Sequence, residues 1–93
     1  MKWRDYNKEN GVWTASCASV MLVGQLIVMN VGLTADGRWR VGAEDFGIDC
    51  MISPNTRYHG SKEQAQKAAV DFLRTAIDVL QTCLDQSRSQ IDQ

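Results

Sequence analysis

The sequence predicts an α+β fold in which three or four antiparallel strands are followed by one long C-terminal helix packed on one face of the sheet. Residues 12–52 alternate between polar and apolar side chains, which is the periodicity of strands. Only short turns separate these runs, and short turns join antiparallel strands. A long amphipathic run follows Gly60. This helix must cover the sheet, because otherwise neither apolar face is buried.

Length and composition indicate a single soluble domain spanning residues 1–93. The chain carries a net charge of -1, with ten basic and eleven acidic residues, so it has no general excess of cations for nucleic-acid phosphates. The apolar run 20–33 is interrupted by Gln25 and Asn30 and is shorter than the roughly 20 residues of a membrane-spanning helix. The polar first eleven residues do not resemble a signal peptide. We expect a cytoplasmic protein without membrane contact.

Residues 1–11 are expected to form a polar N-terminal arm, with Trp3 and Tyr6 as possible anchors. Residues 12–52 are expected to form the strands. The first strand alternates around Trp13, and the next has a wholly apolar core face made of Ile27, Met29, Val31 and Leu33.

Two further features complete the strand region. Asp36-Gly37 predicts a hairpin, because both residues tolerate positive φ. Beyond it, Trp39 and Val41 point one way and Arg38 and Arg40 the other. The run 46–52 alternates again, which predicts another strand that ends at Pro54.

The helix is expected over residues 61–85, with 86–93 as a flexible tail. Ser61 is the predicted N-cap, and Gln64 completes a capping-box pattern. About 24 residues of helix span about 36 Å, whereas a seven-residue strand spans roughly 23 Å, so the helix is expected to overhang the sheet. The overhanging residues pack either against the arm with Trp3 and Tyr6 or against another protein, including a second copy in a homodimer; they are Leu80, Cys83 and Leu84.

Few residues point to chemistry. The three cysteines are far apart and His59 is the single histidine, so a zinc site is not indicated and free thiols are expected. His59 could in principle pair with Cys17 or Cys50, but nothing in the local sequence supports a nucleophile and base. The acidic residues at 44, 45 and 49 match no metal-binding loop and are expected in a solvated turn. We therefore expect neither an enzyme nor a metal or cofactor.

Two surfaces are candidates for binding a partner. The first combines Arg38 and Arg40 with Trp39, residue types that are enriched at protein interfaces, although Trp39 could equally be buried in the core. The second is the polar face of the helix, where aspartates recur every seven residues and form either an acidic stripe or an ordinary solvated face; its members are Asp71, Arg74, Asp78 and Asp85.

The helix start resembles the last helix of a double-stranded-RNA-binding domain. "GSKEQAQKAA" (residues 60–69) matches that family at the positions that start and pack the helix, and at Lys62. Two further lysines that grip phosphates in the family correspond here to Glu63 and Gln66, and Lys67 is offset by one residue. The resemblance implies the fold more than RNA binding, so a reduced nucleic-acid-binding module is the alternative function.

A broader resemblance joins the "DG-x-W-x-V" hairpin (residues 36–41) to the "G-S-x-E-Q-A-x-x-A-A" helix (residues 60–69). This combination is similar to small phage proteins, including some anti-CRISPR proteins. It implies a stoichiometric inhibitor that blocks a host nucleic-acid-guided defence complex by direct contact in the host cytoplasm. The leading hypothesis is thus a non-enzymatic protein-binding module.

Overall fold

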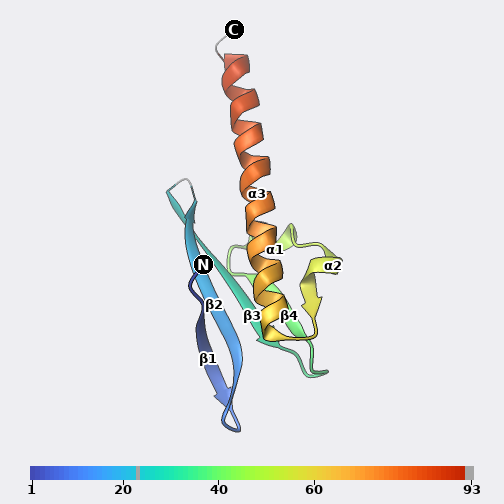
Figure 1. The fold of residues 1–93 in the computed structure, drawn as a ribbon. Helices are drawn as coiled ribbons and strands as arrows, with labels where there is room; N and C mark the ends of the chain where they lie inside the picture. Colours follow the sequence, from blue (N-terminus) through green and yellow to red (C-terminus); the bar gives the residue numbers. More distant parts are fainter. Residues whose placement is uncertain (23, 92–93) are drawn as a thin grey trace.

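The computed structural model of the chain is a five-stranded antiparallel sheet with one long helix, α3 (Lys62–Ile91), across one side (Figure 1). The structure describes residues 1–22 and 24–91, with side chains except at 22, 46, 80, 84 and 86–91. The predicted α+β class is confirmed, and the sheet has five strands instead of three or four.

The strands lie in the sheet in the order in which they occur in the chain. They are β1 (Arg4–Glu9), β2 (Val12–Leu22), β3 (Gln25–Leu33), β4 (Trp39–Ala43) and β5 (Tyr58–His59). Two short helices, α1 (Phe46–Cys50) and α2 (Pro54–Arg57), lie between β4 and β5 in the sequence.

The predicted N-terminal arm is instead an edge strand, β1, paired with β2. Asn10 and Gly11 form the two-residue connection, with φ of 51° and 78°, and Glu9 pairs directly with Val12. Asn-Gly favours this tight hairpin because both central residues need positive φ. The Asn10-Gly11 pair in the sequence therefore indicates that residues 4–9 form a strand paired with β2.

The predicted strand over residues 46–52 is also wrong, because the chain forms α1 there. The Asp45 carboxylate accepts a hydrogen bond from the Ile48 backbone N–H at 3.0 Å and caps the helix. Ile48, in α1, and Ile52, just after the C-cap Met51, both contact the core. Pro54 does not end a strand but occupies the first turn of α2.

The core lies between α3 and the side of the sheet that we call the covered face. Met29, Val31 and Val41 are fully buried there, against Ala65 and Ala69 of α3. The two alanines let the helix approach the strands closely. The predicted core face of β3 is therefore confirmed for all its members except Leu33, which is exposed.

Ser61 caps α3 as predicted, accepting a hydrogen bond from the Gln64 backbone N–H at 3.2 Å. The helix continues to Ile91, so it does not end near residue 85 as expected. Its second half projects past the sheet (Figure 1). Cys83 is exposed there, whereas the predicted contacts of Leu80 and Leu84 lie outside the described side chains.

The two expected anchors of the arm lie on opposite sides of the sheet. Trp3 packs against the core on the covered face. Tyr6 pairs with Ala15, whose neighbours in register point away from α3, so the overhanging helix cannot meet Tyr6. No described helix is apolar over a length sufficient to cross a membrane.

Candidate docking surface on the open face of the sheet

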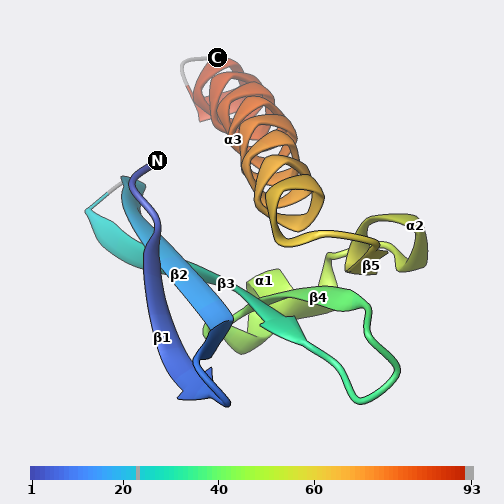
Figure 2. The same cartoon turned by 60° about the horizontal axis from the view of Figure 1, so that its bottom comes forward.

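The second side of the sheet, which we call the open face, is defined by the strand register. Directly opposed residues in antiparallel strands share a face. One continuous row crosses all five strands, and it consists of Tyr6, Ala15, Gly32, Arg40 and Tyr58. Figure 2 shows α3 on the other side of the sheet, with α1 beside the end of β4. The open face thus has no described helix across its central strands.

Small residues lie in register at the middle of the open face, where Ala15 is opposite Gly32 and Cys17 is opposite Asn30. A Cβ atom added to Gly32 would meet no heavy atom within 4 Å, and its φ is not in the positive region. The space directly above Gly32 is therefore open, and its backbone would accept a side chain. Ala15 beside it is covered by its neighbours and is 6% exposed.

Larger side chains of the open face lie on the outer strands. Arg4 and Tyr6 are on β1, Arg40 is on β4 and Tyr58 is on β5. Three aromatic rings of this face are partly exposed, with Tyr6 at 38%, Trp13 at 43% and Tyr58 at 41%.

Cations gather on the same face. The Lys8 ammonium lies 5.1 Å from the Trp13 ring centroid, and the Arg38 guanidinium lies 4.3 Å from that of Tyr58. Arg38 also forms a 2.7 Å ion pair with Asp36, which neutralises it and fixes its position. Arg4 is exposed and forms no salt bridge with a described residue, so its charge is available to a partner. Arg40 is also exposed, but its guanidinium lies over Gly42 near the Asp49 carboxylate, whose pKa it helps to lower.

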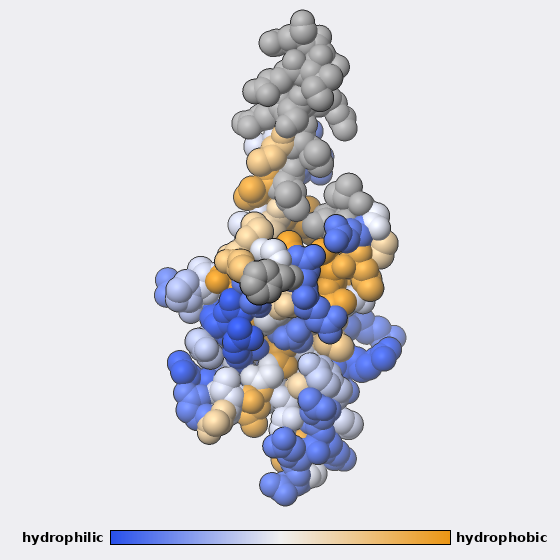
Figure 3. Space-filling view, turned by 180° about the vertical axis from the view of Figure 1, so that it is seen from behind, coloured by the Kyte–Doolittle hydropathy of each residue, from blue (hydrophilic) through white to orange (hydrophobic). Residues whose placement is uncertain are grey.

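The open face is apolar near the β2–β3 turn. Met21 and Leu26 oppose each other in register and are both exposed. Figure 3, which views the molecule from the side away from α3, shows hydrophobic side chains gathered toward this end, with mostly hydrophilic and some scattered hydrophobic side chains over the rest. A depression of about 250 Å³ lies beside this apolar end, lined by Lys2, Arg4, Cys17, Ala18, Ser19, Leu26 and Val28.

Tyr6 keeps its proton at neutral pH. Desolvation raises the pKa of its phenol, and the electrostatic effects of Cys17 and Glu44 add to the rise. Its hydroxyl can therefore both donate and accept a hydrogen bond on the β1 side of the open face. Glu44, just after the end of β4, introduces a negative charge on the same face.

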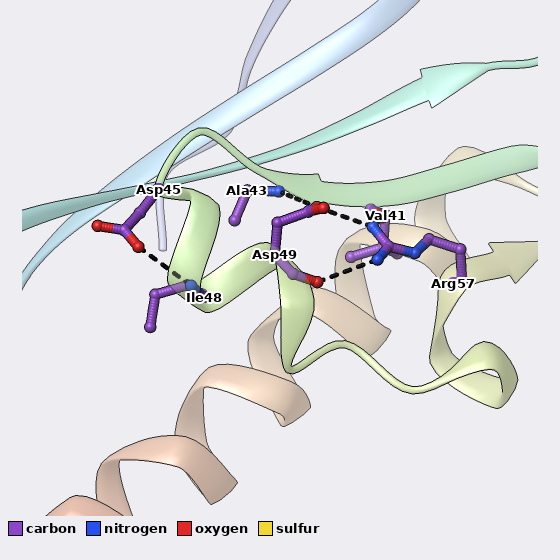
Figure 4. Close-up of polar contacts among 6 residues, drawn as sticks. All are labelled: Val41, Ala43, Asp45, Ile48, Asp49 and Arg57. Atoms are coloured by element: carbon purple, nitrogen blue, oxygen red, sulfur yellow. Dashed lines mark hydrogen bonds and ion pairs between the residues drawn. The ribbon is translucent and has the colours of Figure 1, made fainter.

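Where β4 extends beyond its pairing with β5, its outer backbone groups form hydrogen bonds with the side chains of Arg57 and Asp49 (Figure 4). The Arg57 guanidinium donates to the Val41 carbonyl at 2.9 Å and to Asp49 Oδ1 at 2.8 Å, and the same Asp49 oxygen accepts from the Ala43 N–H at 3.1 Å. The hydrogen bond from Arg57 holds the pKa of the Asp49 carboxyl below its usual range, although burial opposes this. The edge groups of β4 are satisfied internally, which prevents strand addition there.

The first predicted surface is divided between the two faces. Arg38 and Arg40 lie on the open face, whereas Trp39 is half-buried on the covered face and packs against the core. The sequence reasoning missed the other open-face residues because β1 was taken for an arm. The Asn-Gly turn and the alternation of residues 4, 6 and 8 would have placed them.

The second predicted surface is present on the outer side of α3 but is separate from the open face. Its four residues, Asp71, Arg74, Asp78 and Asp85, are all exposed. At the start of the same helix, Lys62 approaches Asp5 at 3.4 Å and Gln66 donates to Ser16 at 3.2 Å. The one lysine shared with the double-stranded-RNA-binding pattern is therefore engaged within the chain.

The predicted chemical groups are dispersed. His59 Nε2 lies 2.6 Å from the Thr56 carbonyl oxygen, and Cys17, Cys50 and Cys83 are free thiols on three different elements. The acidic turn is split between Asp45, which caps α1, and Asp49, which pairs with Arg57. Among the described residues, no three potential metal ligands come together.

Comparison of the chain with protein-family models, with curated proteins and with solved structures gave no match in any of the three.

Proposed function

We propose that the protein is a non-enzymatic binding module whose open face docks a protein partner. The observation that carries the proposal is the open face itself, on which Gly32 has open space above it and exposed aromatic and arginine side chains lie on the neighbouring strands. Glycine inside a strand weakens the sheet and often marks close approach of a ligand or another backbone. Interface cores are enriched in Tyr, Trp, Met and Arg, and this face presents all four types.

The resemblance to anti-CRISPR proteins supports a finer version of the proposal. The partner would then be a host nucleic-acid-guided defence complex, blocked by direct contact in the host cytoplasm. The hairpin at residues 36–41 and the helix starting at Ser61, on which the resemblance depends, are both formed.

Single-stranded nucleic acid is the second candidate, because cations and aromatic rings share the open face. We rank it second for two reasons. Asp36 neutralises Arg38, and the chain has a net charge of -1, so it has no general excess of cations for phosphates.

The substitution Gly32→Trp tests the proposal directly. The new ring would occupy the open space above Gly32, and a strand tolerates an aromatic residue at such a position. We expect unchanged thermal unfolding and at least a tenfold loss of partner capture from a lysate of the organism that carries the gene. Relief of defence-complex interference against a targeted plasmid, measured in the same cells, should be lost in parallel.

The matched control is Asp71→Lys/Asp78→Lys on the outer face of α3, where both side chains are exposed. We expect this double variant to capture the partner as the wild type does. Retention by Gly32→Trp combined with loss in the helix variant would transfer the docking surface to α3 and contradict the proposal.

A further inference from the structure

We infer that the open face binds the C-terminal residue of the partner, with the free carboxylate beside Lys2 and Arg4; this rests on the proposed function. The place for it is the depression of about 250 Å³ near the β2–β3 turn. Pockets for drug-sized ligands measure about 300–1,000 Å³, so this depression takes a smaller group. A single large residue is a group of that kind.

Two cations form one side of the depression. Lys2 and Arg4 are exposed, and neither forms a salt bridge with a residue that the structure describes. The described residues that line the depression include no acidic side chain. An adjoining depression of about 480 Å³ is lined by the same two cations with Trp3 and Ser19, so both cations are accessible from two sides. A carboxylate complements them, because its hydrogen bonds to arginine and lysine are charge-assisted.

The other side of the depression is apolar. Leu26 is 56% exposed, and Val28 lies two residues along β3 on the same face. Met21 pairs with Leu26 in register and is 63% exposed, so the apolar surface continues from the depression toward the β2–β3 turn. Contiguous exposed apolar surface marks sites of interaction. A large apolar side chain of the partner would bury this side.

A single C-terminal residue supplies both groups. Its carboxylate and its side chain are attached to the same Cα atom, so the two remain together. In an extended internal segment, neighbouring side chains point to opposite sides, and the next side chain on the same side lies about 6.6 Å further on. An internal carboxylate and an apolar side chain would therefore need a longer site than a depression of about 250 Å³ offers. Capture of a C-terminal carboxylate is a recurrent mode of peptide recognition.

Glu44 sets the direction in which this residue lies. Its backbone N–H donates to the Val28 carbonyl at 3.1 Å, so Glu44 lies beside the apolar side of the depression. The positive charges are on the β1 side of β2, whereas this negative charge is beyond β3. A carboxylate is attracted to Lys2 and Arg4 and repelled by Glu44, which orients the terminal residue across the strands.

Selection from a random peptide library displayed with free C-termini tests the inference, with counter-selection on Lys2→Glu/Arg4→Glu, two exposed positions. We expect the enriched peptides to share a large apolar last residue. Amidation of that C-terminus should weaken binding at least about tenfold, because its charge-assisted hydrogen bonds are lost. Leu26→Ser should weaken binding several-fold, because it removes the apolar contact.

The matched control is Lys67→Glu/Arg74→Glu, which reverses two exposed charges on the outer side of α3. This variant has the same net charge as Lys2→Glu/Arg4→Glu, and it should bind the enriched peptides as the wild type does. Thermal unfolding followed by circular dichroism checks that every variant folds.

The outcomes separate this inference from the proposed function. Peptides that bind equally well after amidation would overturn the inference, and so would a selection in which no peptide distinguishes wild type from Lys2→Glu/Arg4→Glu. The docking face would still stand if Gly32→Trp loses partner capture, and would fall as well if it does not. Phosphatidylserine vesicles that bind wild type but not Lys2→Glu/Arg4→Glu, with no peptide selected, would assign the two cations to an anionic lipid surface instead.

Discussion

Replacing Met29 with alanine is expected to lower the free energy of unfolding by about 2–5 kcal/mol, the usual range for a buried large-to-small substitution. Met29 is fully buried at the centre of the core. Its register partners are Ala18 on β2 and Ala43 on β4, so the flanking strands have no large side chain to fill the cavity. Total stability for a domain of this size is about 5–14 kcal/mol, so the loss is a large fraction of it.

Met21→Ala is the matched control, because Met21 is 63% exposed on the open face. Chemical denaturation of both variants should show a large fall in midpoint for Met29→Ala and a small change for Met21→Ala. Equal effects in the two variants would contradict the assignment of the covered face as the core. Near-wild-type stability of Met29→Ala would do the same.

Replacing Arg57 with methionine is expected to cost about 2–4 kcal/mol, because a half-buried charge network loses its donor. Arg57 donates to the Val41 carbonyl, to the Asp49 carboxylate and to the Asp49 carbonyl at 2.8–3.0 Å. The substitution leaves these acceptors without their donor and opens the β4 edge. We also expect concentration-dependent association, since an uncovered edge pairs with other chains.

Arg74→Met, on the exposed outer face of α3, is the control for loss of an arginine. The pH dependence supplies a second test. The pKa of Asp49 is lowered in the folded chain, so its contribution is complete above the ordinary carboxyl pKa of about 3.9 and is lost as pH falls toward the lowered value. The stability difference between wild type and Arg57→Met should therefore shrink below about pH 4. A difference that grows on acidification would show that the ion pair is not its source.

Much of the fold could be predicted from side-chain periodicity and local turn chemistry. The α3 cap at Ser61, the hairpin at Asp36-Gly37 and the core face of β3 follow from local sequence. The errors lie where local patterns are ambiguous. Residues 46–52 fit both the period of two of a strand and the i, i+4 spacing of a helix. The capping hydrogen bond of Asp45 favours the helix, which forms over Phe46–Cys50.

The candidate site was harder to predict because it depends on register across strands. Tyr6 and Tyr58 are far apart in the sequence, yet both belong to one row through Ala15, Gly32 and Arg40. Sequence alone identified Arg38 and Arg40 but assigned Trp39 to the same patch. The strand alternation that separates Trp39 from its arginine neighbours was visible, whereas the absence of a covering helix on the open face was not.

Site-specific photo-crosslinking tests the docking face most directly. A benzoylphenylalanine at position 32 lies over the open space of the open face, and one at position 67 lies on the exposed outer side of α3. Illumination in the lysate should give a discrete crosslinked partner from position 32 and none from position 67, with loss of the product when unlabelled wild type is added in excess. A competable crosslink from position 67 with none from position 32 would contradict the account.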